Sequence, residues 1–168
     1  MSSPPLSPLP SVAVGATFAQ VGIVVDDLDR ALERHTGMGP WSVWTYDAEF
    51  VPTLTLDGRP ADCRFRVALD GNDPQLELIQ PLDHRSPYAG WLGRGGAGIH
   101  HLGYLVDDLQ DAVDAMTVAE FEVIMSGSGY GLDGGGGFAY FDTVEAVGYI
   151  TEAIERSERR RDPEYVFP

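Results

Sequence analysis

Four residues have the types and spacing of a metal-binding site: Gln20, Glu77, His101 and Glu152. Gln20 and His101 begin two copies of a repeat, QVGIVVDDL and HLGYLVDDL, and therefore hold the same position in each copy. Glu77 and Glu152 each precede an apolar pair in an apolar segment, where an unpaired buried charge is costly. One imidazole, two carboxylates and one amide oxygen form a donor set that suits Zn²⁺, Mn²⁺, Co²⁺, Ni²⁺ or Fe²⁺.

The same four residues also have a purely structural explanation. Glu77 and Glu152 can pair with arginines or face solvent, and His101 can be a core histidine whose ring nitrogens are satisfied. Residue types and spacing alone leave both alternatives open. The metal site requires a fold that brings the two copies of the repeat together around a pseudo-two-fold axis.

Each copy of the repeat predicts a strand followed by a helix. In the first copy, residues 18–25 are rich in β-branched side chains and predict a buried strand. Asp26 and Asp27 then supply an N-cap and a first-turn acid for a helix over residues 28–35. Further strands of this half are predicted over residues 41–50, 53–56, 63–69 and 75–80.

The second copy predicts the same order of elements. A strand over 99–106 leads to a helix over 109–118, and further strands are predicted over residues 121–125, 138–142 and 147–154. The glycine-rich segment 127–137 has neither a GxGxxG nor a GxxxxGK[ST] pattern, so it predicts a flexible loop and no nucleotide site. The connector between the halves is predicted to contain at best a short helical turn.

These elements predict five segments along the chain. They are a flexible Pro/Ser tail (residues 1–16), a first module (17–81), a linker (82–98), a second module (99–155) and a charged C-terminal tail (156–168).

The composition excludes several classes of partner. A formal net charge of −15 argues against binding to nucleic acid or to an anionic membrane surface. No apolar run approaches the ~20 residues of a membrane span. A single cysteine, Cys63, excludes an internal disulfide framework, and the first residues do not form a signal-peptide pattern, so a cytoplasmic location is predicted.

The stretch from Gln75 to Met116 resembles the vicinal oxygen chelate superfamily, which includes glyoxalase I, extradiol dioxygenases and methylmalonyl-CoA epimerase. It is most similar to the epimerase and glyoxalase-like branch. The similarity lies in the order of its motifs: a strand with the pair E-L, a linker with the pairs P-L and S-P, and then the motifs G-I-H-H and V-D-D. The resemblance implies an α+β fold of two tandem βαβββ modules whose curved sheets enclose a metal cleft. It also implies that Gln20, Glu77, His101 and Glu152 hold a divalent metal, with Gln20 where the family usually has histidine.

The resemblance further implies a metal-dependent isomerase, epimerase or lyase that moves a proton next to a carbonyl of a chelating substrate. Glu49 is a candidate for the base, and a ligand such as Glu152 or Glu77 could leave the metal and act as the base instead. Tyr140 is a candidate hydrogen-bond donor to an oxyanion. Two alternatives remain: a non-catalytic ligand-binding or resistance protein of the same fold, and an extradiol dioxygenase, which the ligand set favours least.

Other residues complete the expected site. Four aromatic residues can line a pocket for an aromatic or acyl small molecule: Trp41, Trp44, Tyr46 and Trp91. Strand alternation places His100 on the face opposite His101, so His100 is predicted to be structural. The superfamily's habit of pairing modules across subunits predicts a homodimer.

Overall fold

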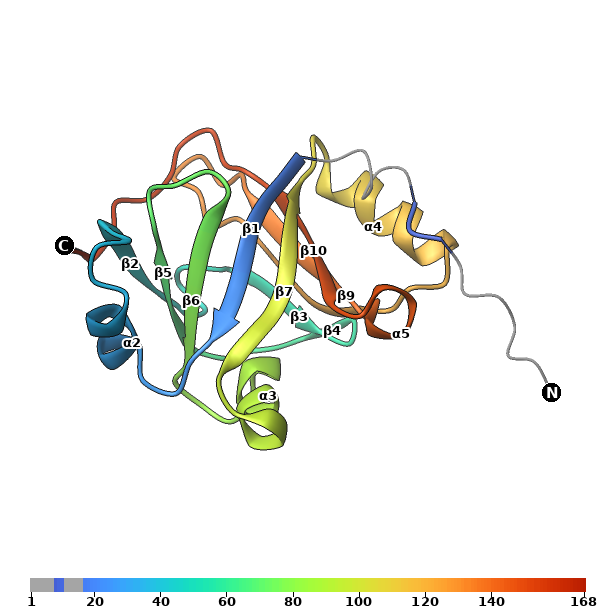
Figure 1. The fold of residues 1–168 in the computed structure, drawn as a ribbon. Coiled ribbons are helices and arrows are strands. Elements are labelled where there is room, and N and C mark those ends of the chain that lie inside the picture. The colour runs from blue at the N-terminus through green and yellow to red at the C-terminus, as the bar shows by residue number, and fades with distance from the viewer. Residues whose placement is uncertain (1–7, 11–16) are drawn as a thin grey trace.

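The computed structural model describes residues 8–10 and 17–168, so most of the predicted Pro/Ser tail lies outside the described residues. Its strands form one open mixed sheet in the order β11-β2-β5-β6-β1-β7-β10-β9-β8-β3-β4. The sheet is curved, and β1 and β7 lie side by side near its centre (Figure 1).

The first half of the chain comprises seven elements within the described residues. They are β1 (Thr17–Val24), α2 (Leu28–Arg34), β2 (Trp41–Tyr46), β3 (Thr53–Leu56), β4 (Arg59–Pro60), β5 (Phe65–Leu69) and β6 (Gln75–Pro81). The connector forms α3 (Pro87–Gly95). The second half comprises β7 (Gly98–Leu105), α4 (Leu109–Val118), β8 (Val123–Ser128), β9 (Gly137–Phe141), α5 (Val144–Val147) and β10 (Ile150–Glu155), and β11 (Tyr165–Phe167) follows.

The Asp-Asp pair of each repeat starts a helix, as predicted. The Asp27 side chain accepts a hydrogen bond from the backbone of Arg30, and that of Asp108 accepts one from Asp111. Each aspartate thus caps orphan N–H groups of the first turn. The α4 bounds match the prediction, and α2 ends one residue earlier than predicted.

The two helices cover the outer face of the curved sheet at opposite ends. Leu28 and Leu32 of α2 pack with Trp41 and Val43 of β2. At the other end, Met116 of α4 packs with β9 and β10. A third buried cluster, with residues from both halves, forms the inner face. The predicted α+β fold, with two βαβββ halves around a curved sheet, is therefore confirmed.

Three local predictions were wrong. The connector contains a nine-residue helix, α3, because the Ser86 side chain caps it and Pro87 occupies its first turn. Strand β3 joins the sheet of the second half by pairing with β8, and the β3–β4 hairpin extends that edge.

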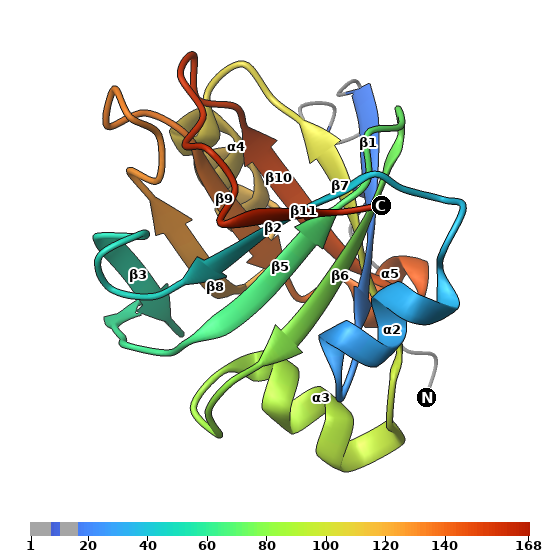
Figure 2. The same cartoon turned by 90° about the vertical axis from the view of Figure 1, so that its left-hand side faces the viewer.

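The third error concerns the charged C-terminal tail. Residues 156–168 leave β10, cross to the opposite end of the sheet and add β11 to β2 (Figures 1 and 2). We call residues 156–168 the C-terminal strap. Within the described part of the chain, no helix has the length and apolar character needed to cross a membrane.

Candidate metal centre

Four neighbouring strands in the middle of the sheet carry the four candidate ligands. In the order β6, β1, β7 and β10, they carry Glu77, Gln20, His101 and Glu152. The glycine of each repeat copy lies between two of these residues. Gly22 pairs with Glu77 and His101, and Gly103 pairs with Gln20 and Glu152.

The repeat glycines leave space for the candidate ligands. A Cβ atom on Gly22 would lie 1.9 Å from Cε1 of His101, so the imidazole occupies the volume of the missing side chain. A Cβ atom on Gly103 would lie 2.9 Å from Oε2 of Glu152 and 3.0 Å from Cβ of Gln20. The two glycines thus have an equivalent function in the two copies, which the sequence repeat alone does not reveal.

Three of the predicted ligands converge on one point. Nε2 of His101 lies 3.3 Å from Oε2 of Glu77 and 3.1 Å from Oε2 of Glu152. One ligand atom from each residue lies within 4.8 Å of the other two. The three facing atoms are buried, and none of them forms a hydrogen bond with any described residue outside this trio. Because orphaned buried polar atoms are rare, and here include two carboxylate oxygens, this donor set fits a divalent cation.

The electrostatics of the cluster lead to the same conclusion. Burial by itself would lower the pKa of His101, but Glu152 and Glu77 outweigh it and raise that pKa to about 9. Burial raises the pKa of Glu152, and the adjacent His101 opposes this shift. Without a cation, a protonated His101 supplies a positive charge in direct contact with the two buried carboxylates, and a divalent cation would replace that charge.

His100 lies beside the cluster, and its predicted position was wrong. The pairing of β1 with β7 shifts register between Gly22 and Ile23, and this bulge interrupts the strand alternation at His100. Nδ1 of His100 lies 3.1 Å from Nδ1 of His101. Burial and the charge of His101 lower the pKa of His100 to about 3, so a neutral His100 can accept the Nδ1–H of His101. That contact leaves Nε2 of His101 facing the carboxylates.

Tyr140 covers the cluster from β9. Its ring centroid lies 4.7 Å from that of His101, and it pairs with Glu152 across β9 and β10. Its hydroxyl lies 2.9 Å from the hydroxyl of Tyr88, which α3 supplies. Burial and the charge of Glu152 raise the pKa of Tyr140, so its hydroxyl remains protonated. Sequence reasoning missed Tyr88, although Ser86-Pro87 is a helix-start signal that places it in a first turn.

The inner face of the sheet forms a cleft over this cluster. Its lining includes Gln20, Glu77, Tyr140 and Glu152. The structure therefore brings Gln20 to the same cleft as the three converging residues. Glu49, by contrast, is exposed in the segment after β2 and does not belong to the cleft lining. A base role for Glu49 has no support from its position.

The predicted aromatic pocket is split between two faces. Side chains alternate along β2, so Trp41 faces α2 on the outer side, while Trp44 and Tyr46 belong to the inner cluster. Trp91 packs against the inner cluster from α3. Tyr46 lines the cleft directly, together with Tyr130.

Residues 19–141 match the model of the Glyoxalase/Bleomycin resistance protein/Dioxygenase superfamily. The chain belongs to this superfamily. The match includes both copies of the repeat and three of the four predicted ligands, and it ends before Glu152 and the C-terminal strap.

Within the superfamily, the chain is similar to epimerases. It is 43% identical over 54 residues to an ethylmalonyl-CoA/methylmalonyl-CoA epimerase of Cereibacter sphaeroides. That match covers 32% of this chain and 40% of the length of the relative.

Solved structures of methylmalonyl-CoA epimerases share the fold. The Mycobacterium tuberculosis enzyme has a TM-score of 0.55 at 21% identity, over 84% of this chain and 88% of the other. A Streptomyces coelicolor variant in complex with 2-nitronate-propionyl-CoA has a TM-score of 0.62 at 18% identity, over 84% and 99%. These similarities confirm the fold.

Proposed function

We propose that this superfamily member is a divalent-metal-dependent enzyme of the epimerase type. It would remove the proton from the carbon next to the carbonyl of an acyl-CoA thioester and return a proton to the same carbon. The observation that carries the proposal is the convergence of the orphaned Glu77, His101 and Glu152 atoms in a cleft of this fold. The epimerase relatives support the reaction type and the substrate class.

The proposed metal ligands are Glu77, His101 and Glu152, with Gln20 as a fourth through its amide oxygen. A bound divalent cation would act as a Lewis acid toward the carbonyl oxygen and so make the adjacent proton more acidic. Gln20 in place of a histidine supplies a weaker neutral donor, so we expect a preference for a cation that accepts several oxygen ligands.

The cleft offers few groups that can accept the proton. Among the described residues, Glu77 and Glu152 are the only carboxylates in its lining, so we assign the proton transfer to one of them and favour Glu152. The pairing of Tyr140 with Glu152 places both on neighbouring strands in the cleft. Because its hydroxyl remains protonated, Tyr140 can donate a hydrogen bond to the developing oxyanion.

The test combines metal analysis with proton exchange. The protein is purified without chelator, its metal content is measured, and ¹H NMR follows exchange of the α-proton of methylmalonyl-CoA in D₂O with added Mn²⁺, Co²⁺, Ni²⁺ or Zn²⁺. We expect bound metal and exchange that a chelator stops. His101→Ala should abolish both, whereas His84→Ala, which changes an exposed histidine, should leave both intact.

Bound metal without exchange of any acyl-CoA would reject the epimerase activity. Less than a tenth of an equivalent of metal, together with tight binding of an acyl or aromatic ligand, would instead favour the non-catalytic binding protein. The homodimer and the cytoplasmic location stay predictions.

A further inference from the structure

The C-terminal strap concentrates positive charge in an acidic protein. The chain has a net charge of −15 and eleven basic residues, all arginines, of which four lie between residues 156 and 161. Two of these, Arg156 and Arg160, line a pocket together with Gln20. This pocket shares Gln20, Tyr130, Ile154 and Arg160 with the lining of the metal-centre cleft, so the two are continuous.

Contacts on both sides of Arg160 fix the backbone of the strap. The carbonyl of Arg159 accepts a 2.8 Å hydrogen bond from the backbone N–H of Leu132. The carbonyl of Arg161 accepts a hydrogen bond from Nε1 of Trp44 at 3.2 Å. The side-chain Nε of Arg161 donates a hydrogen bond to the carbonyl of Tyr130 at 3.0 Å. The position of Arg160 is therefore set before any ligand arrives.

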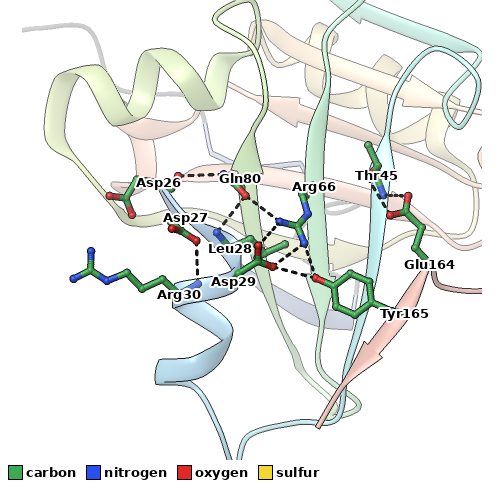
Figure 3. Close-up of polar contacts among 10 residues, drawn as sticks. All are labelled: Asp26, Asp27, Leu28, Asp29, Arg30, Thr45, Arg66, Gln80, Glu164 and Tyr165. Atoms are coloured by element: carbon green, nitrogen blue, oxygen red, sulfur yellow. Dashed lines mark hydrogen bonds and ion pairs between the residues drawn. The ribbon is translucent and has the colours of Figure 1, made fainter.

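The end of the strap is fixed on the first half of the chain. Both carboxylate oxygens of Glu164 accept hydrogen bonds from Thr45, at 2.9 Å from its backbone N–H and 3.2 Å from its hydroxyl (Figure 3). The Tyr165 hydroxyl lies between Arg66 of β5 and Asp29 of α2 (Figure 3). The strap thus joins the two ends of the sheet across the cleft.

Arg160 is available to an external anion. Its guanidinium lies 4.8 Å from the ring centroid of Trp44, which orients it by a cation–π contact. Arg66 and Arg85 pair with carboxylates, but neither Arg156 nor Arg160 forms an ion pair or a side-chain hydrogen bond with any residue in 8–10 or 17–168. A planar guanidinium held in this way binds carboxylate or phosphate oxygens in a bidentate manner.

We propose that Arg156 and Arg160 form an anion-binding site at the mouth of the cleft, which holds a carboxylate or phosphate group of the substrate. The proposal deepens the proposed function, on which it rests for the identity of the inner site. The acidic metal centre and the arginines lie in one continuous cleft, so a substrate that fits both carries an anionic group in addition to its chelating carbonyl.

The strap lies outside the residues that match the superfamily model, which end at residue 141. The two arginines of the anion site therefore lie outside the part of the chain that matches the superfamily model. The anion site would select among carbonyl compounds that the metal centre alone could not distinguish.

The test measures binding of simple anions to the full chain as purified. Malonate, inorganic phosphate and the neutral malonamide are titrated by isothermal calorimetry and by tryptophan fluorescence, which Trp44 beneath Arg160 should report. We expect malonate or phosphate to bind and malonamide not to bind. The tighter of the two anions identifies a carboxylate or a phosphate ester as the group recognised.

Arg159→Gln is the matched control for Arg160→Gln. Both remove one exposed arginine from the same run, but the Arg159 side chain lines neither pocket. Loss of a charge-assisted hydrogen bond should weaken anion binding about tenfold or more in Arg160→Gln and less than about twofold in Arg159→Gln. Arg160→Lys, which retains the charge and the fold but lacks the fork, should be intermediate.

Equal weakening by Arg159→Gln and Arg160→Gln would overturn the proposal, because it would reveal only a general effect of charge. Binding of malonamide as tight as that of malonate would also overturn it. The result is separable from the proposed function: anion binding that depends on Arg160 can persist in a protein without exchange activity. Conversely, exchange activity whose KM for methylmalonyl-CoA is unchanged in Arg160→Gln would refute the site and keep the function.

Discussion

Gly22→Ala tests the close approach on which the metal centre depends. The new Cβ atom would lie 1.9 Å from Cε1, 2.3 Å from Nε2 and 2.4 Å from Nδ1 of His101. Ordinary carbon contacts begin at about 3.5 Å, so the imidazole would have to move by about 1.6 Å (3.5 − 1.9).

The imidazole has little space into which it can move. His101 is fully buried, lies under the ring of Tyr140, and faces the carboxylates of Glu77 and Glu152. Overpacking a core typically costs about 1–3 kcal/mol, and separating His101 from the two buried carboxylates adds to this cost. A loss of about 3 kcal/mol corresponds to a fall in Tm of about 6–12 °C for a domain of this size.

The assay is thermal unfolding followed by circular dichroism, with metal content measured on the same samples. Gly98→Ala is the matched control, because Gly98 lies in β7 and does not need a positive φ. Apart from its two chain neighbours, no described residue has an atom within 4 Å of the new Cβ position. We expect Gly98→Ala to change stability by less than about 0.5 kcal/mol. If Gly22→Ala unfolds at the temperature of the wild type and retains metal, the His101 ring does not occupy the space above Gly22, and the reasoning fails.

The buried groups of the site and core support three further predictions. A divalent cation added to the chelator-treated protein at about 100 times its Kd should stabilise the fold by about 2.7 kcal/mol, which corresponds to a rise in Tm of about 5–11 °C. The His101→Ala variant should not show this rise. No rise in Tm with any tested cation would contradict the metal site. Burial raises the pKa of Cys63 from 9.0 to about 11, so at pH 8 its thiolate fraction should be about 100-fold lower than in the unfolded chain. The measurement is the rate at which a thiol reagent modifies Cys63 in the native protein and in denaturant. Two rates within about tenfold of each other would contradict this shift. Tyr140→Phe should lower the free energy of unfolding in urea by about 1–3 kcal/mol, because it leaves the buried Tyr88 hydroxyl without its hydrogen-bond partner. The double change of Tyr88 and Tyr140 to Phe should cost less than the sum of the two single changes. Additive costs would argue against the hydrogen bond between the two hydroxyls.

The sequence alone determined the elements whose causes are local. A β-branched run followed by Asp-Asp predicts a strand and a capped helix, because the cap bonds to a backbone group three residues ahead. The same repeat indicated two similar halves, and the structure joins their strands in one open sheet. Together with the superfamily resemblance, it selected Glu77, His101 and Glu152, which the structure brings together.

Only the tertiary structure decided the features that depend on contacts between distant segments. The bulge that turns His100 toward His101 arises from the register between β1 and β7, and a sequence pattern with a period of two residues does not reveal a register shift. The pairing of β3 with β8 likewise joins segments about 70 residues apart.

The C-terminal strap shows the same distinction most clearly. Its charged and proline-containing sequence is typical of a tail, because no local pattern shows that β2 has a free edge for β11 to join. The sequence therefore determined which residues have the chemistry to bind a cation. The fold decided which of them meet, and it placed the arginines of the strap at the mouth of the same cleft, because burial and strand pairing act between residues that are far apart in the chain.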